Sequence, residues 1–313
     1  MEATIEFNPI YLPTNQGHGI ARNISLRTCK NRLVALMDAD DISYPRRFEK
    51  QLELFQKNSK LSCVGGQITE FQGQPENIIS RREVSEQDAD IKTYARKRCP
   101  MNQMTVMLDK DVVDKAGGYR DWYCNEDYYL WIRMIRQNRR FANLPDDLVN
   151  VRVDDVSTRR GGMKYFQSEK RLQSYMLHHR MITLPEYWRN VLVRFGGEVV
   201  AGDGLRKQLF RFMRSTPEKV KKSSRKPEEI SGKAEGGTGQ YPPFSVAICV
   251  YGKDNPEWFD TALDSIIVHQ TVKPNEVVLV VDGPVPDTIQ KIIDKYSEIC
   301  GGYKIHGNSA SGE

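Results

Sequence analysis

The sequence predicts an α/β domain with a mostly parallel central sheet, flanked by helices and built from both ends of the chain. Nearly uninterrupted apolar runs occur at residues 33–37, 244–251 and 276–281. Such runs are typical of strands that are buried on both faces of a parallel sheet. A segment as short as residues 244–313 could bury few of its apolar groups unaided. We therefore expect the late strands to join the early ones in one sheet.

The N-terminal part, residues 1–160, is expected to supply most of the strands. Pro45 can open a helix, and Gly117 with Gly118 can end one. Glu126 and Asp127 suit a helix start, where the helix dipole favours negative charge. The expected helices are a run ending near residue 30 and residues 44–56, 88–98, 111–116 and 128–135. The expected strands are residues 33–37, 63–71, 104–108 and 148–153.

The rest of the chain divides by composition. A helical extension is expected at residues 161–216, with helices at 164–181 and 186–212 and a break near Gly196 and Gly202. Lys, Ser, Glu, Gly and Pro dominate residues 217–243, which predicts a flexible linker. The strand–helix–strand–helix order of residues 244–300 follows, with Asn255 and Pro256 starting the first helix. Residues 301–313 are polar and are expected to be a flexible tail.

Composition excludes several classes of protein. Hydrophobic residues make up 39% and charged residues 28%, which suits a globular domain with a core. The sequence contains no apolar run long enough to span a membrane and no secretory signal, so we expect a cytoplasmic protein. The six scattered cysteines predict reduced thiols rather than a zinc site. A net charge of +5 arises largely between residues 189 and 226. This basic stretch lacks a nucleic-acid motif, and acidic lipid or a solvated face remain its alternatives.

Acidic residues follow the first buried strand directly. Asp38, Asp40 and Asp41 stand at its carboxyl end, which is the edge where open α/β sheets bind ligands. Carboxylate oxygens suit hard cations such as Mg²⁺ or Mn²⁺. In isolation, the same three residues would more often be an acidic turn that caps the next helix.

Read from residue 244 to the end and then from residue 1 to about 214, the chain resembles a family 2 glycosyltransferase with a GT-A fold. The matching pieces are Val250-Tyr251, ALDSI at 262–266, Gln270-Thr271, Val280 to Gly283, Asn15 to Asn23, Asp38 to Asp41 and Glu126-Asp127. It is most similar to the bacterial exopolysaccharide branch of the amylovoran-biosynthesis transferases. In that branch AGGY at 116–119, EDYYLW at 126–131 and RRGG at 159–162 also have counterparts.

This order is that of a circular permutation. The old ends would be joined by the polar segment near residues 217–243, whose glycine content favours an engineered gene. Both the joint and the new ends have the character of surface loops, where permutation is tolerated. A rival interpretation is a piece of a tandem enzyme that carries halves of two domains. Such halves could pair between two chains in a swapped dimer or another homo-oligomer.

The resemblance implies a role for each donor-site residue. Asp40 is expected to bind the metal, and Asp38 the ribose or the metal shell. Asp282 is expected to accept from the uracil or ribose, and Tyr251 to stack on the base. The residues expected to contact the rest of the nucleotide are Arg22, Asn23 and, with Arg160, Arg159. Structural alternatives are a core tyrosine at Tyr251, a salt bridge at Arg22 and a solvated loop at Arg159.

On the acceptor side, the resemblance implies that Asp127 is the general base of an inverting, single-displacement reaction, with Glu126 as second candidate. Trp122 could pack against a sugar, whereas a core position is expected for Trp131. Relatives often carry a histidine where this chain has Gln103 and another where it has Asp154. These two differences leave acceptor and metal contacts at both places open.

The function that this resemblance predicts is metal-assisted transfer of a hexose from a UDP-sugar to a hydroxyl group. The acceptor would be a glycan, a glycoprotein or a lipid-linked sugar, with peripheral contact to the inner face of the membrane as an option. Two rivals remain. A nucleotidyltransferase would need a longer glycine-rich loop than the one after Tyr251, and a non-catalytic partner of a polysaccharide assembly complex would bind UDP-sugar without turnover.

Overall fold

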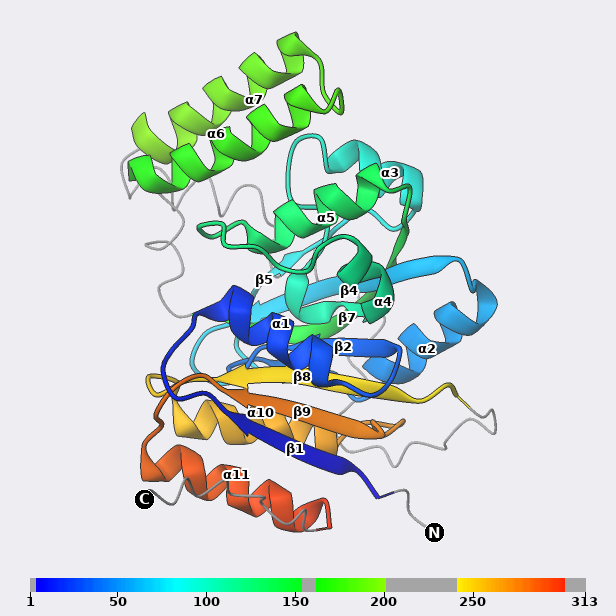
Figure 1. The fold of residues 1–313 in the computed structure, drawn as a ribbon, viewed down its shortest axis with the longest axis vertical. Coiled ribbons are helices and arrows are strands. Elements are labelled where there is room, and N and C mark those ends of the chain that lie inside the picture. Colours follow the sequence, from blue (N-terminus) through cyan, green and yellow to red (C-terminus); the bar gives the residue numbers. More distant parts are fainter. Residues whose placement is uncertain (1–3, 154–161, 201–240, 302–313) are drawn as a thin grey trace, which may run out of the picture.

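A computed structural model describes residues 4–153, 162–200 and 241–301. Its strands form one mixed sheet (Figure 1). The strand order is β1 (Glu6–Tyr11), β9 (Glu276–Val281), β8 (Phe244–Val250), β2 (Leu33–Met37), β6 (Met107–Asp109), β4 (Leu61–Phe71), β7 (Arg140–Arg152) and β3 (Ile42–Ser43). A further strand, β5 (Ile78–Arg82), pairs with β4.

Both ends of the chain meet in the parallel half of this sheet. β9 pairs in parallel with β1 on one side and with β8 on the other, and β8 pairs in parallel with β2. The predicted joining of late and early strands is therefore what the structure shows. β2 and β9 are not immediate neighbours, however, because β8 lies between them. Beyond β2 the pairings of β6, β5 and β3 are antiparallel, so the sheet is mixed rather than uniformly parallel.

Helices cover the two faces of the sheet (Figure 1). One face packs against α10 (Pro256–Ile267), α11 (Asp287–Ile299) and α2 (Arg47–Lys57). The other packs against α1 (His18–Thr28), α4 (Lys110–Lys115) and α5 (Glu126–Arg136). A short helix, α3 (Asp88–Tyr94), adds Ile91 to this second core.

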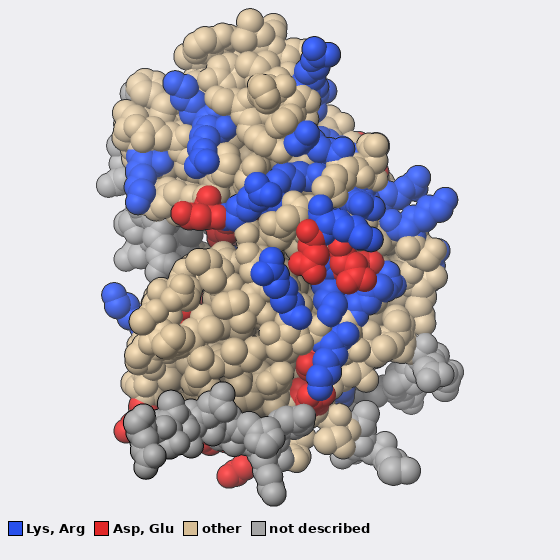
Figure 2. Space-filling model, in the orientation of Figure 1, with Lys and Arg blue, Asp and Glu red and all other residues tan. Residues whose placement is uncertain are grey.

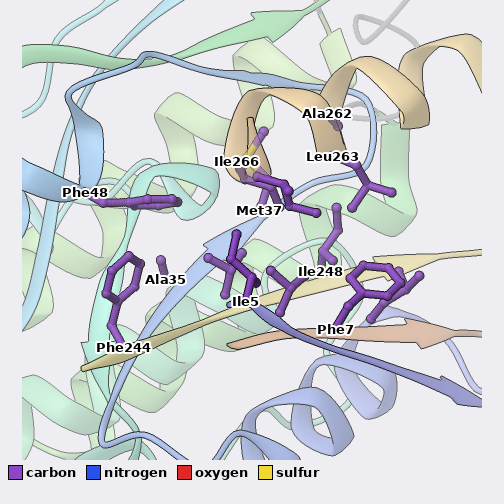
Figure 3. Close-up of a cluster of buried hydrophobic side chains, with 14 of the residues drawn as sticks. Ile5, Phe7, Ala35, Met37, Phe48, Phe244, Ile248, Ala262, Leu263 and Ile266 are labelled. Atoms are coloured by element: carbon purple, nitrogen blue, oxygen red, sulfur yellow. The ribbon is translucent and has the colours of Figure 1, made fainter. Parts of the chain in front are cut away.

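Alternation along the strands divides the two cores. Ala35 and Met37 of β2 join the first core, with Phe244 and Ile248 of β8, whereas Val34 and Leu36 join the second. This is the period of two that the pleat of a strand imposes. Figure 3 shows the first core, where Phe48 of α2 lies beside Phe244, and Leu263 and Ile266 of α10 face Ile248 and Met37. The parallel strands and three helices thus form one rigid support for the strand ends.

A helical hairpin stands beside this domain. α6 (Gly162–His178) and α7 (Leu184–Phe195) pack with α5 in a third apolar cluster. Thr183 and Glu186 form a capping box at the start of α7, so this helix begins earlier than predicted. A π-helical turn, Gly196–Val200, follows at the predicted glycine break. The remainder of the predicted helix, residues 201–212, and nearly all of the predicted linker lie outside the described residues.

The structure differs from the predicted elements at the sheet margins. Residues Gln103–Thr105 form a 3₁₀ turn and only Met107–Asp109 form the strand that was expected at 104–108. β1, β3 and β5 were not predicted in full, because short edge strands carry a weak apolar pattern. Among the described residues, no helix has the length and apolar character to cross a membrane.

Candidate active site

Asp282 ends β9 and organises the loop before α1. Its two carboxylate oxygens accept hydrogen bonds from the backbone N–H groups of Gln16 at 2.6 Å and Gly17 at 3.0 Å. The next residue, Gly283, has φ +87°, and a Cβ there would lie 2.7 Å from the nitrogen of Asn15. Glycine is required at this close approach. Asp282 is buried, so its first role in this structure is to shape the loop.

Tyr251 follows β8 at the same edge of the sheet. Its backbone N–H donates to Asp254 at 2.9 Å, and its half-buried ring faces the ring of His18 at 6.3 Å between centroids. The neighbouring Gly252 has no room for a Cβ, which would lie 2.6 Å from the carbonyl oxygen of Pro284. Tyr251 therefore lies next to the amino-terminal end of α1, across from the loop that Asp282 holds.

The three acids after β2 occupy three different environments. Asp38 is half-buried and accepts from Arg22 at 2.9 Å. Asp40 is exposed, and Asp41 is buried and accepts the backbone N–H of Arg152 at 3.0 Å. Burial, followed by the charges of Asp40 and Asp38, raises the pKa of Asp41 well above its usual range. The turn is a concentrated acidic site, and Asp40 is its solvent-facing carboxylate.

Arg152, at the end of β7, supports this turn from the side. Its Nε lies 3.4 Å from the carbonyl oxygen of Asp40. Its guanidinium also stacks over the rings of Phe71 at 4.6 Å and Trp258 at 4.4 Å. Such cation–π contacts fix a guanidinium in place. Arg152 therefore ties the acidic turn to β4 and to α10.

Arg47 is a second support that the sequence analysis missed. Its fully buried guanidinium donates to the carbonyl oxygen of Leu36 at 2.6 Å and to Gln51 at 3.3 Å. Burial lowers the pKa of Arg47 to about 9, while Asp38 and Asp41 act in the opposite direction. A cation thus stands beneath the acidic turn. Its position in the apolar helix pattern of residues 44–56 gave no sign of burial.

Arg22 connects the two acidic parts of the site. It reaches Asp38 at 2.9 Å and Glu126 at 3.3 Å. Burial opposes its charge, but Asp38, Tyr119 and Glu126 together raise the pKa of Arg22. Arg22 thus forms the salt bridges of the structural alternative, which connect the end of β2 with the start of α5. Its contact with the nucleotide stays a prediction.

Glu126 and Asp127 begin α5 beside this arginine. Burial and the charge of Asp127 raise the pKa of Glu126, against the effect of Arg22. Asp127 accepts its neighbour's N–H, that of Tyr128, at 2.6 Å, and the thiol of Cys99 lies 3.8 Å from its other oxygen. The carboxylate of Glu126 thus forms an ion pair with Arg22. The carboxylate of Asp127 contacts a backbone N–H group and a thiol instead.

Asn23 contacts the backbone of Tyr119 in this structure, and its predicted contact with nucleotide stays a prediction. Its amide donates to the carbonyl oxygen of Tyr119 and accepts the N–H of Tyr119, both at 2.7 Å. Gln103 donates to the hydroxyl group of Tyr119 at 2.5 Å. Both residues therefore position Tyr119, whose ring lies 6.0 Å from the guanidinium carbon of Arg22.

The two tryptophans belong to the interior. Trp131 is fully buried, as predicted. Trp122 is also buried: its indole N–H donates to Ser168 at 3.3 Å and its ring packs on Tyr129 at 4.2 Å. Since the guanidinium of Arg171 also lies 4.0 Å from the centroid of this ring, the structure favours a core position for Trp122 over contact with a sugar. Arg159, Arg160 and Asp154 lie outside the described residues.

Cys249 on β8 lies between two acidic strand ends, because Met37 of β2 pairs with Ile248 and Val281 of β9 pairs with Val250. Burial raises the pKa of Cys249 to about 12, and its thiol also feels the charges of Arg22, Asp38 and Asp282. Asp38 and Asp282 therefore lie near a common residue on the strand between their own strands. Within the described part of the chain, no cluster of three or more His, Cys, Asp or Glu side chains could hold a metal by itself.

The charged side chains of this site lie at the carboxyl ends of parallel strands, which is where α/β enzymes with open sheets bind their ligands. The family Glycosyl transferase family 2 matches residues 3–118, which include the acidic turn after β2. Together with the relatives described next, this match shows that the chain belongs to glycosyltransferase family 2 and has its GT-A type of α/β fold.

An uncharacterized glycosyltransferase of Haemophilus influenzae is 36% identical over 214 residues, or 68% of this chain and 79% of the relative. The amylovoran biosynthesis glycosyltransferase AmsE of Erwinia amylovora is 38% identical over 51% of this chain and 60% of its own length. An Escherichia coli UDP-Gal:alpha-D-GlcNAc-diphosphoundecaprenol beta-1,3-galactosyltransferase is 30% identical over 58% of this chain and 66% of its own length. The last two relatives are thus matched over less than two thirds of their lengths.

Proposed function

We propose that this glycosyltransferase moves a hexose from a UDP-sugar to a hydroxyl group of a glycan or lipid-linked acceptor, with inversion at the transferred carbon. One observation carries the proposal. Arg22 joins Asp38 after β2 to Glu126 at the start of α5, and β8 alone separates the end of β2 from the end of β9 that carries Asp282. One of these relatives, the Escherichia coli galactosyltransferase, supports the donor and acceptor, since its name gives a UDP-sugar and a diphosphoundecaprenol-linked GlcNAc.

A divalent cation fits the residues that are present. Mg²⁺ is commonly bound by one or two carboxylates together with substrate phosphates and water, rather than by a full protein cage. Asp40 is exposed and Asp38 is half-buried beside it, so these two would hold Mg²⁺ or Mn²⁺. The cation would neutralise the charge that develops on the leaving diphosphate.

The chain's own side chains divide the remaining work. Tyr251 offers an aromatic face for the uracil near the loop that Asp282 holds. Arg22 supplies a fixed positive charge beside the phosphates, because its two carboxylate partners keep it ionised and oriented. The predicted Arg159 would add a second cation.

Asp127 is the general base in this proposal. As the acceptor oxygen bonds to the anomeric carbon, its proton passes to the Asp127 carboxylate and the bond from that carbon to the UDP oxygen breaks. A single in-line displacement of this kind inverts the configuration. Asp127 is preferred to Glu126 because the carboxylate of Glu126 already accepts from Arg22 at 3.3 Å, which leaves it less available to the hydroxyl group of an acceptor.

The test is the release of UDP from a panel of UDP-sugars in the presence of Mn²⁺. We expect turnover with at least one donor, loss of turnover with EDTA, and a decrease of about 10²–10⁴-fold for Asp127→Asn. Glu126→Gln is the matched variant and should lose less. Binding of UDP without turnover of any donor would instead support the non-catalytic partner, and pyrophosphate release would support a nucleotidyltransferase.

A further inference from the structure

Helix α7 presents an apolar face to solvent. Leu184, Trp188, Leu192 and Phe195 recur at intervals of three and four residues, so they share one side of the helix. Their exposed fractions are 57%, 53%, 64% and 39%. Val193, at 70%, adds a further exposed apolar side chain. A contiguous apolar face of this kind is unusual on a protein surface and indicates an interaction site.

The opposite side of α7 is firmly attached, so the exposure is a fixed property of the fold. Tyr187 and Val191 are buried in the third apolar cluster. Asn190 donates to the carbonyl oxygen of Arg96 and to Gln173, both at 2.9 Å. Rotation of the helix to hide its apolar face would break these bonds.

The hairpin around this face carries a one-sided charge. Within Gly162–Phe195 the acids are Glu169 and Glu186, and each is paired, with Arg194 at 2.8 Å and Arg96 at 2.9 Å. The exposed charged side chains of the hairpin are all basic: Lys164, Lys170, Arg171, Arg180 and Arg189. Figure 2 shows Lys and Arg side chains over this upper part of the molecule, and on the face that it draws the acidic side chains lie below them.

We propose that the α6–α7 hairpin docks the enzyme onto an anionic lipid bilayer, with the apolar face of α7 in the headgroup region. An exposed apolar face with a tryptophan, bordered by cations, is the pattern of helices that lie in a membrane interface. A second copy of the chain fits less well, because a symmetric dimer through this face would place the same cations against each other. The proposal does not depend on the donor chemistry of the site.

Docking here would bring the acceptor side of the site close to the membrane. Ser168 of α6 binds the segment directly before Glu126: its hydroxyl group donates to Tyr123 at 2.6 Å and accepts from Asn125 at 3.1 Å. The amino-terminal ends of α6, α5 and α1 also lie on the same side of the molecule (Figure 1). A lipid-linked acceptor embedded in the bilayer could thus meet Asp127 without leaving the surface.

The first experiment is flotation of the whole chain with vesicles of phosphatidylglycerol and phosphatidylcholine, without donor. We expect binding to vesicles rich in phosphatidylglycerol, a blue shift of the Trp188 fluorescence, and release at high salt. Absence of flotation at low salt would overturn the proposal. Equal binding to pure phosphatidylcholine would overturn its electrostatic part.

Variants distinguish vesicle binding through this surface from nonspecific vesicle binding. Trp188→Ser combined with Leu192→Ser, and Lys170→Glu combined with Arg189→Glu, should each weaken vesicle binding by at least about tenfold. The matched controls are Val268→Ser with Ile299→Ser, which are 44% and 52% exposed, and the exposed pair Lys60→Glu with Lys291→Glu. Both controls should bind like the wild type.

Failure of docking and failure of catalysis remain distinguishable. Each variant is also assayed for transfer to a water-soluble acceptor, which should be unchanged because none of these side chains belongs to the active site. Unchanged vesicle binding of the α7 variant would overturn the proposal. It would also be overturned if this variant converted a wild-type dimer into monomers, because the face would then bind a second copy.

Discussion

The two acidic strand ends of the site use their carboxylates in opposite ways. After β9, buried Asp282 gives both oxygens to backbone N–H groups of the loop before α1. After β2, Asp40 faces solvent and Asp38 shares Arg22 with Glu126. The comparison shows that aspartates at equivalent strand ends can have different roles. Asp282 holds the shape of a loop, whereas Asp40 leaves its carboxylate exposed for chemistry.

Replacement of Asp40 should give the largest effect. Asp40→Asn keeps the size of the side chain but removes the charge that would hold the cation, so transfer should fall by at least about 100-fold. The unfolding free energy should change by less than about 0.5 kcal/mol, because the side chain is exposed. UDP release and urea denaturation measure the two quantities. A large loss of stability with normal turnover would contradict this role, because it would show that Asp40 stabilises the fold and is not needed to hold the cation.

Replacement of Asp282, in contrast, should lower the unfolding free energy. Asp282→Ala leaves the N–H groups of Gln16 and Gly17 without their acceptor, which should cost about 2–3 kcal/mol of unfolding free energy. Asp282→Asn, which keeps one acceptor oxygen, should lose roughly half as much. Urea denaturation of both variants checks the order. If both were as stable as the wild type, the loop would not depend on this carboxylate.

Asn23 offers a smaller test of the same distinction. Its amide makes two hydrogen bonds of 2.7 Å to the backbone of Tyr119. Asn23→Ala should therefore lower the unfolding free energy by about 1–2 kcal/mol, while the Kd for UDP should stay within about twofold. Calorimetric titration with UDP and thermal unfolding provide the readouts. A selective loss of UDP affinity would instead show that Asn23 contacts the nucleotide.

The smallest expected effect is a pH dependence at Glu126. Burial and Asp127 raise its pKa above the ordinary 4.5, so the folded state holds this proton more tightly than the unfolded state. The stability from this difference is present below about pH 4.5 and is lost as pH rises through the folded value. Glu126→Gln should remove that part of the decline. Unfolding curves from pH 4 to 7 would contradict this if the two slopes were identical.

Much of the fold follows from the sequence because its apolar runs are clear. The strands at Leu33–Met37 and Glu276–Val281 and the helix Asp287–Ile299 lie where the pattern predicts them. Helix α7 begins at Leu184, before the predicted start at residue 186, because Thr183 and Glu186 form a capping box that the apolar pattern does not reveal. The permuted order itself stays a prediction. It requires β9 and β8 to lie between β1 and β2, and the sheet has that order.

The site was less predictable than the fold. The acids could be found from their places after strands, and Arg22 does connect Asp38 with Glu126. That these acids and Asp282 share one donor site stays a prediction. The sequence could not show how each acid is used, because that depends on partners distant in the chain. Arg47 illustrates the limit: a helix-start arginine is normally solvated, whereas here it is buried beneath the acidic turn.

The most direct test of a shared donor site is a crystal structure of the chain with UDP and Mn²⁺. The account predicts one anomalous manganese peak within about 2.5 Å of the Asp40 carboxylate, bridged to the diphosphate, with the uracil between Tyr251 and the Asp282 loop. A manganese ion away from Asp40, or a uracil in a pocket that does not adjoin the β2 end, would contradict it.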